Sequence, residues 1–326
     1  METVDLVVAA GEAGERLDRL LARRIPNLSR ARAQRLIQAG AVAIGAEVAT
    51  KSSQTVDAQT HIMVQLRTRA PEMGVVPEAI RLKVIYEDAD LAVIDKPAGM
   101  VMHPAPGHRT GTLVHALVHR FGDRLAVVAD GSRPGIVHRL DRGTSGVVVV
   151  AMTDHAHQHL AAQFAARTVR KEYLALVYGD PEPDSGTIDA PLGRDPKNRK
   201  RISTRARRAR AAVTDWQRLE SFPGFALIEA RPRTGRTHQV RVHLAHMHHA
   251  IVGDDDYSGR QWKGVPDGRT RSLVRNFGRP ALHAHRLAFE HPSTGASVAF
   301  EAPLAADFQQ LLATLREGRD AGCLSQ

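Results

Sequence analysis

A segment without hydrophobic periodicity, residues 67–77, interrupts this chain of 326 residues and contains two prolines and a glycine. Proline and glycine break helices and strands, so the segment predicts a linker. We therefore expect a small N-terminal domain over residues 1–66, a linker over 67–81 and a larger domain over 82–326. Two domains also agree with the usual domain size of roughly 150 residues.

The composition favours a globular protein that binds a polyanion. Apolar residues make up 43% and charged residues 25% of the chain, as in soluble globular proteins. A single cysteine, Cys323, excludes an intramolecular disulfide and a cysteine-based zinc site. The formal net charge of +10 attracts polyanions, among which nucleic acid is the leading candidate. The longest apolar run is too short to span a bilayer and no secretory signal is visible, so we expect a cytoplasmic protein without membrane contact.

The N-terminal region combines a basic helical hairpin with short strands. Leucines at 17, 20 and 21 predict an amphipathic helix over 16–25, followed by a second helix and by strands at 41–44, 47–48 and 61–66. Seven arginines and one acid lie between positions 16 and 35, so one face of the helix pair must be positive. The pattern over 14–66 resembles the S4 RNA-binding module, with a solvated basic hairpin as the alternative. The resemblance implies RNA contacts at Arg16, Arg19, Arg30, Arg32 and Arg35.

The larger domain mixes strands and helices without regular alternation. Residues 82–97 predict two strands around an acidic turn, and the β-branched run 147–151 predicts a buried strand. Helices are expected over 112–120 and 155–166, and further strands over 173–178, 211–216, 225–230 and 281–289. This order predicts an α+β fold.

A polar cluster precedes the expected buried strand and holds side chains suited to chemistry. His138, Arg139, Asp141 and Arg142 share a stretch with three glycines, at positions 135, 143 and 146. Nearby arginines lower the pKa of a carboxyl group, so Asp141 is expected to be ionised. An ionised aspartate in a closed site is a nucleophile or a general base. The residues alone leave open the alternative of a structural ion pair in a turn.

Several motifs in a fixed order resemble those of the RluA family of RNA pseudouridine synthases. The nine residues HRLDRGTSG at 138–146 resemble the family's HRLDxxTSG motif. Other stretches in family order are DKPAG at 95–99, RKEY at 170–173, TGRTHQVRVH at 234–243 and VGD at 252–254. With the S4 pattern included, the branch that modifies large-subunit ribosomal RNA is the most similar. The resemblance implies an α+β catalytic domain with a mixed, mostly antiparallel central sheet and a small N-terminal S4-like (αL) RNA-binding domain.

Within this resemblance, Asp141 matches the essential aspartate of the family. It would either attack C1′ of the target nucleotide or take a proton from C2′, and the sequence leaves both open. Tyr173 matches the tyrosine that packs against the target base, and Arg241 matches the basic residue that pairs with the aspartate. Arg236 is a second candidate for that pairing. The chemistry has no redox step and no net group transfer, so no cofactor and no metal are expected.

The remaining residues implied by the family contact the substrate. Val240 would line the uracil pocket, and Arg139 would fill the gap left by a flipped nucleotide, because a planar guanidinium can stack in place of a base. His138 would shape the loop or contact phosphate. Residues 194–210 hold nine basic side chains and one acid, at the position of an RNA-contacting insertion of the family. The expected contacts there are Lys197, Arg199, Lys200, Arg201 and Arg205.

Other functions compete with this hypothesis. A metal-dependent nuclease or phosphatase is suggested by His243, His246, His248 and His249 with the acids at 254–256, but the HExxH pattern is absent. A non-catalytic RNA-binding factor for ribosome assembly would also suit the basic regions. Transfer RNA is an alternative substrate to large-subunit ribosomal RNA. We expect a monomer that has RNA as its partner.

Overall fold

The structure is a computed structural model that describes residues 3–26, 28, 30–66, 75–105, 107–126, 133–199 and 201–323. Lys200 and the side chains of Arg32 and Arg35, three of the expected RNA contacts, lie outside this description. Most of the segment 67–77 lies outside it as well. Within the described chain, no helix is long and apolar enough to cross a membrane.

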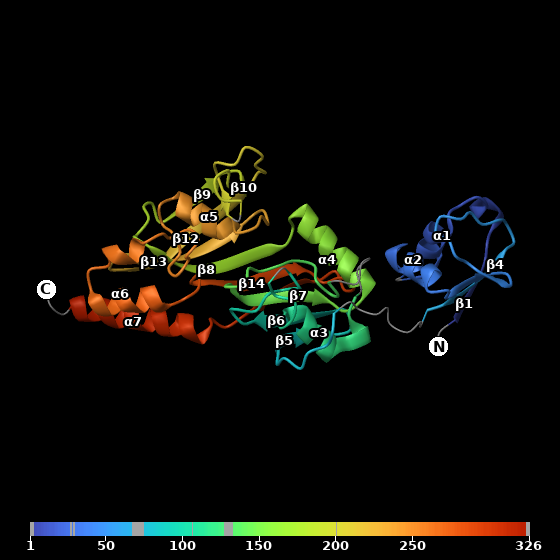
Figure 1. Ribbon diagram of the computed structural model, residues 1–326, viewed down its shortest axis with the longest axis horizontal. Helices are drawn as coiled ribbons and strands as arrows, with labels where there is room; N and C mark the ends of the chain where they lie inside the picture. The colour runs from blue at the N-terminus through green and yellow to red at the C-terminus, as the bar shows by residue number, and fades with distance from the viewer. Residues whose placement is uncertain are drawn as a thin grey trace.

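The elements near the N-terminus form an antiparallel sheet with two helices packed on it (Figure 1). The strands are β1 (Thr3–Val7), β2 (Val42–Ile44), β3 (Glu47–Val48) and β4 (His61–Gln65), in the spatial order β1-β4-β2-β3. The helices are α1 (Leu17–Arg24) and α2 (Arg30–Gln38), preceded by the short η1 (Ala10–Glu12). The leucines at 17, 20 and 21 are buried because their helical spacing places them on one face of α1. Strand β1 is absent from the sequence prediction, since two inward apolar residues, Val4 and Leu6, make too short an alternation.

The larger part of the chain is built on a nine-stranded sheet. Its order is β5-β6-β7-β14-β8-β13-β12-β9, with β15 paired to β14. Neighbouring strands are antiparallel except β7 and β14, which are parallel, so the α+β class and the mixed, mostly antiparallel sheet are confirmed. The strands are β5 (Lys83–Glu87), β6 (Leu91–Lys96), β7 (Ser145–Ala151), β8 (Arg170–Tyr178), β9 (Ser185–Asp189), β12 (Val213–Phe222), β13 (Phe225–Pro232), β14 (Leu282–Glu290) and β15 (Ser297–Glu301).

Helices pack on this sheet and at its ends (Figure 1). Helix α4 lies against β7 and β14, α5 lies against β12 and β13, and α7 packs against β12 and α6. The bounds are α3 (Leu113–Phe121), α4 (Asp154–Ala166), α5 (Gln239–His246), α6 (Gly268–Asn276) and α7 (Ala306–Cys323), with short turns η2 (Gly122–Arg124) and η3 (Gln261–Gly264). A small hairpin of β10 (Gly193–Arg194) and β11 (Ile202–Ser203) stands apart from the main sheet.

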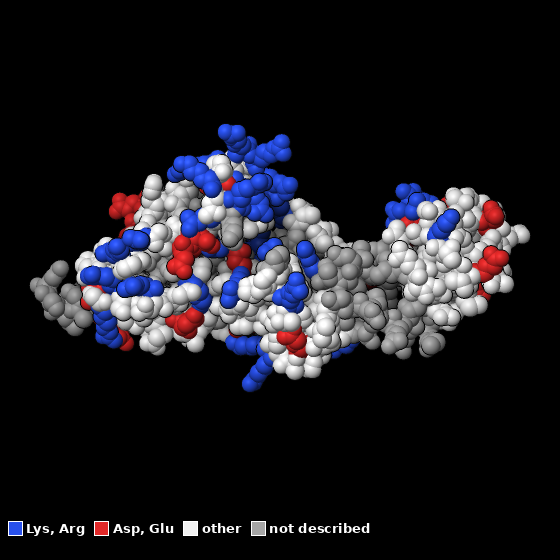
Figure 2. All heavy atoms as spheres, viewed as in Figure 1, with Lys and Arg blue, Asp and Glu red and all other residues white. Residues whose placement is uncertain are grey.

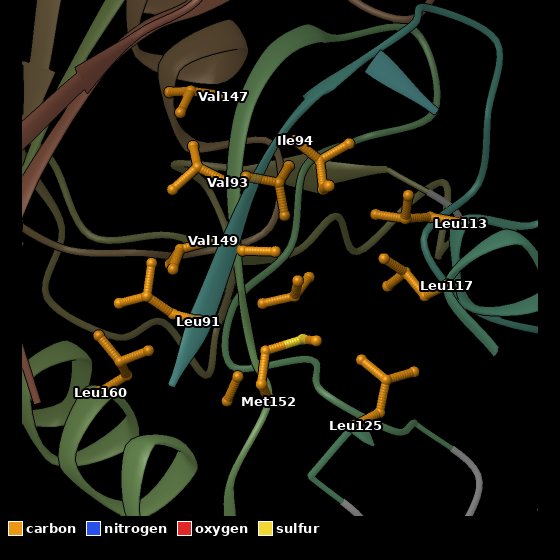
Figure 3. Packing of buried hydrophobic residues seen from close by; sticks show 14 of the residues in the cluster. Leu91, Val93, Ile94, Leu113, Leu117, Leu125, Val147, Val149, Met152 and Leu160 are labelled. Atoms are coloured by element: carbon orange, nitrogen blue, oxygen red, sulfur yellow. The ribbon is translucent and has the colours of Figure 1, made fainter. Parts of the chain in front are cut away.

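Two clusters of buried apolar side chains hold the sheet and its helices together. One lies around β6, β7 and α3 and includes Leu91, Val149 and Leu117 (Figure 3). The other lies around β8, β13, α5 and α7 and includes Phe225. The ring of Tyr173, on β8, packs against both clusters. The two hydrophobic clusters therefore meet in the middle of the sheet, at Tyr173.

Gly146 fixes the parallel pairing at the centre of the sheet. It lies in β7 opposite Ala284 of β14 and has a φ of 115°. A Cβ at this position would lie 2.1 Å from the carbonyl oxygen of Ala284, which no side chain could tolerate. Glycine therefore permits the close approach of the two strands. The loop that precedes β7 and carries Asp141 therefore lies at the middle of the sheet.

Candidate active site

The loop that carries Asp141 is fixed to its surroundings by backbone contacts. The amide of Gly99 donates to the carbonyl of Arg142 at 2.8 Å. The Nη1 of Arg279 donates to the carbonyl of Gly143 at 3.2 Å. These two hydrogen bonds fix the backbone at Arg142 and Gly143, the two residues that follow Asp141. The carboxylate is partly screened from solvent, with 19% of its side chain exposed.

Arg241, in the first turn of α5, is the cation that faces Asp141. Its Nη1 lies 3.4 Å from Oδ2 of Asp141. Its Nε and Nη2 each donate to the buried carboxylate of Asp254 at 2.7 Å, and Nη2 also donates to Asp256 at 2.8 Å. Burial by itself lowers the pKa of Arg241, but the bonds and charges of Asp254 and Asp141 raise it well above its ordinary value. Arg241 is therefore a permanent positive charge beside Asp141.

Arg236, the second candidate for this pairing, is directed elsewhere. Its Nε donates to the carbonyl of Ala211 at 3.3 Å. Its backbone amide donates to Oε1 of Gln239 at 3.0 Å, which ties the preceding loop to the start of α5. The ion pair in the structure is thus between Asp141 and Arg241.

Two cavities share the Asp141 loop as a wall. The smaller, of about 380 Å³, is also lined by Lys171, Tyr173 and Val240. The larger, of about 720 Å³, extends along Met102 and Gly253. The residues that border both are Arg139, Leu140, Asp141, His238 and Arg241. A ligand in the smaller cavity would therefore meet the carboxylate and the guanidinium together.

The smaller cavity has walls that suit a flat ring. Val240 is buried beside it, and the ring of Tyr173 forms another part of its lining. Aromatic side chains accept a stacked base in many in-plane orientations. Burial, and next the negative charge of Asp141, raise the pKa of the Tyr173 hydroxyl, which stays protonated near neutral pH.

His138 and Arg139 are adjacent in sequence but differ in their surroundings. The Nε2 of His138 accepts a hydrogen bond from the amide of Val149 at 3.1 Å, and its ring stacks on Phe164. Burial, and next the charge of Lys171, lower the pKa of His138 to about 3, so the ring stays neutral and shapes the loop. Arg139 is exposed and, in the described chain, its guanidinium has no hydrogen-bond or ion-pair partner.

His238 is a site residue to which the sequence analysis gave no role. Its backbone has a φ of 56° at the start of α5. Its Nε2 lies 3.9 Å from Oδ2 of Asp141, and its Nδ1 lies 2.8 Å from the hydroxyl of Tyr257. Burial lowers the pKa of His238, with the charge of Asp141 opposing that shift. Its place inside the TGRTHQ stretch was the available signal, but a motif does not show which way a ring points.

Lys96 is a second residue without an earlier role. Its side chain is fully buried, and Nζ donates to the carbonyls of Pro97 at 2.9 Å and Met100 at 3.0 Å. Burial lowers the pKa of Lys96 to about 7, with the charge of Asp141 opposing the shift. A charged lysine here adds to the positive field around Asp141.

The basic stretch 194–210 gathers its cations on one surface. Figure 2 shows Lys and Arg clustered over the β10–β11 hairpin, at the top of the view. Four of the expected RNA contacts are exposed there: Lys197, Arg199, Arg201 and Arg205. The amide of Ile202 donates to the hydroxyl of Tyr257 at 3.0 Å, so one tyrosine contacts both this hairpin and His238.

In the N-terminal elements, two of the arginines expected to contact RNA form ion pairs within the protein. Arg16 and Arg30 both donate to the buried carboxylate of Asp18, at 3.1 Å and 2.9 Å. Hydrogen bonding from Arg16 is the largest of the effects that hold the pKa of Asp18 well below its ordinary value. Arg19 is exposed on the same helix pair. Asp18 therefore fixes two of the guanidiniums and leaves Arg19 extended into solvent.

Two of the four histidines that suggested a metal site, His243 and His249, take part in other contacts. His243 is buried and bonds to Thr214 and to the carbonyl of Ala190. His249 bonds to the carbonyl of Tyr178. Among the described residues, the group whose geometry could hold a metal ion lies elsewhere, at Asp88, Asp90 and His291.

Comparisons with known proteins identify the family of this chain. Residues 90–246 match a family model described as RNA pseudouridylate synthase, and residues 15–62 match the S4 domain. A ribosomal large subunit pseudouridine synthase D from Xanthomonas campestris is 42% identical over 319 residues, which cover 95% of this chain and 92% of that protein. This chain belongs to the RNA pseudouridine synthase family. The synthase is therefore an isomerase, and its S4 domain is an RNA-binding module.

Other relatives of this synthase align over almost the same length. An uncharacterized RNA pseudouridine synthase from Chlorobaculum parvum is 42% identical over 92% of this chain and 94% of that protein. A ribosomal large subunit pseudouridine synthase D from Pseudomonas aeruginosa is 38% identical over 97% of this chain and 98% of that protein. The solved structure of human RNA pseudouridylate synthase domain containing 1 superposes with a TM-score of 0.55 and 26% identity, over 73% of this chain and 96% of that chain.

Proposed function

We propose that this synthase converts one or more uridines of large-subunit ribosomal RNA to pseudouridine, with Asp141 as the catalytic residue. The observation that carries the proposal is the ion pair of Asp141 with Arg241 at the wall of a cavity lined by Tyr173 and Val240. The names of the relatives from Xanthomonas and Pseudomonas support the ribosomal substrate. We further propose that it acts as a monomer in the cytoplasm, with domains at 1–66 and 82–326.

The reaction rearranges one nucleotide without adding or removing atoms. The bond from C1′ of the ribose to N1 of uracil breaks, and its electron pair stays on the base. Asp141 supports this step either by bonding to C1′ or by taking the C2′ proton. The base turns and C5 bonds to C1′. On the first route the Asp141–C1′ bond breaks at this step, and on the second route Asp141 returns the proton to C2′. The proton on C5 then leaves and N1 gains a proton. In either role the guanidinium of Arg241, with Nη1 3.4 Å from Oδ2, orients the Asp141 carboxylate at the cavity wall.

The RNA must present a uridine that has left its stack. Flipping a nucleotide costs a few kcal/mol, roughly, for the lost stacking and pairing. Arg139 borders both cavities and is free to stack in the vacated position. The exposed cations of the β10–β11 hairpin and of α1 would bind the phosphates around that site.

The test is tritium release from transcribed large-subunit ribosomal RNA labelled at C5 of uridine, with the wild-type protein and Asp141→Asn. We expect release by the wild type only, with both proteins binding the RNA equally well. Release by Asp141→Asn would remove the catalytic role of that residue. Transfer RNA and assembled subunits carry the same label in parallel, and release from transfer RNA alone would overturn the ribosomal substrate.

A further inference from the structure

Lys171 is a cation in the wall of the smaller cavity, and the reaction as described does not use it. It precedes Tyr173 by two residues on β8, so strand alternation places both side chains on the same face. Both line the cavity that also contains Val240. Nζ donates to the carbonyl of Thr234 at 3.2 Å. An ammonium has three N–H donors, so this bond leaves donors for a ligand.

No carboxylate neutralises Lys171 within the described residues. The ion pairs of the described chain include none to this side chain. Its neighbours are Arg167, a second cation directly after α4, and His138 on the loop before β7, which stays neutral. The other groups of the cavity wall that carry or can take a positive charge are Arg139, Arg236, His238 and Arg241. Asp141 lies at the cavity wall but is paired with Arg241. Burial, and next the charge of Arg167, lower the pKa of Lys171 to about 8, which leaves most molecules charged at pH 7.

A partly buried cation without a counter-ion is unfavourable in the empty cavity and favourable once negative charge enters it. The proposed reaction creates such a charge at this place. When C1′–N1 breaks, the electron pair stays on uracil and is delocalised over N1 and the carbonyl oxygens of the ring. Ground-state uridine is neutral, so a cation here acts mainly on the state that follows bond breaking.

We propose that Lys171 is a catalytic residue that donates a hydrogen bond to a carbonyl oxygen of the target uracil and stabilises the ring's negative charge during its detachment. This inference rests on the proposed function. Lys171 remains an ammonium throughout, so the proton balance of the reaction is unchanged. The charge returns to zero when C5 bonds to C1′, loses its proton and N1 becomes protonated.

The experiment compares Lys171→Met, which removes the charge and keeps much of the length, with Lys171→Arg, which keeps the charge. Arg170→Met is the matched control, since Arg170 is the neighbouring cation on the exposed face of β8. We expect Lys171→Met to slow single-turnover conversion by about 100-fold, as for loss of one donor to a developing anion. Its RNA affinity and thermal midpoint should stay close to wild type. Lys171→Arg should retain a rate within about tenfold of wild type, and Arg170→Met should convert at the wild-type rate.

A pH profile separates this role from a structural bond to Thr234. The wild-type rate should fall above about pH 8 as Lys171 loses its proton, and that fall should be absent from Lys171→Arg because a guanidinium stays charged. Lys171→Met converting within threefold of wild type would overturn the inference, as would the same alkaline fall in Lys171→Arg. A wild-type protein without any product contradicts the proposed function instead, so the two failures are distinguishable.

Discussion

The carboxylate of Asp254 accepts two hydrogen bonds from Arg241, each at 2.7 Å, and its side chain is completely buried. This bidentate pair uses Nε and Nη2 and leaves Nη1 directed at Asp141. Asp254 therefore determines where the positive charge beside Asp141 lies. The buried Asp254 thus positions Arg241, and Arg241 in turn contacts Asp141 at the cavity wall.

We expect Asp254→Ala to destabilise the fold and to slow the reaction. It leaves a buried guanidinium without its main partner, which costs about 3 kcal/mol or more of unfolding free energy. Denaturant unfolding and single-turnover conversion measure the two effects. Asp256→Ala is the control, because its side chain is 48% exposed and such pairs contribute little. Equal stability of the two variants would contradict the dominance of the Asp254 pair.

We expect Arg241 to determine the conversion rate and Arg236 to affect mainly the affinity for RNA. Arg241→Lys keeps a cation but loses the two-point contact with Asp254, so we expect the conversion rate to fall by at least about tenfold. Arg236→Lys should change RNA affinity more than rate, since its Nε bonds to a backbone carbonyl and not to Asp141. Rate and affinity measured for both variants would decide the matter, and a larger rate loss in Arg236→Lys would reverse our assignment.

Acid should destabilise the protein through His138. The pKa of this ring is about 3 in the fold and about 6.5 when unfolded, so below pH 6.5 the unfolded chain takes up a proton that the folded chain refuses. Stability is therefore lost as the pH falls from 6.5 towards 3, by up to about 1.4 kcal/mol per pH unit. Urea unfolding of wild type and His138→Gln at several pH values tests this. A wild type no more acid-sensitive than the variant would show that the ring does not stay neutral.

The β10–β11 hairpin should bind phosphate by charge alone. Arg199→Gln is expected to weaken RNA binding and to reduce the slope of log affinity against log salt by about 1. Arg316→Gln is a control in which the lost cation lies on α7 and pairs with Glu220 of β12. Binding isotherms at several salt concentrations provide both slopes. An unchanged slope for Arg199→Gln would remove this residue from the RNA interface.

Much of the fold and of the candidate site could be predicted because local pattern and motif agree. The run of β-branched residues that follows Asp141 forms β7, and every residue of that strand is buried. The two-residue spacing of Lys171 and Tyr173 places them on one face of β8, but no sequence pattern indicated that both side chains line one cavity. The roles of Asp141, Tyr173 and Arg241 remain predictions that the proposed experiments test.

Other features depend on contacts between segments far apart in the chain. Lys96 reads as an ordinary strand-end lysine, and only the fold buries it beneath the loop of Asp141. His238 approaches Asp141 through a left-handed backbone conformation, which no periodicity reveals. Asp254 was visible in a motif, but its pairing with Arg241 requires the turn after α5 to fold back on the helix.

Gly146 has a consequence for how this enzyme can vary over time. Because a Cβ there would meet the carbonyl of Ala284 at 2.1 Å, even the smallest replacement, alanine, would push β7 away from β14. The loop of Asp141 would move with β7, since only four residues separate Asp141 from Gly146. A substitution at Gly146 would thus displace strand β7 and, with it, the carboxylate of Asp141. Position 146 therefore accepts glycine and no residue with a Cβ.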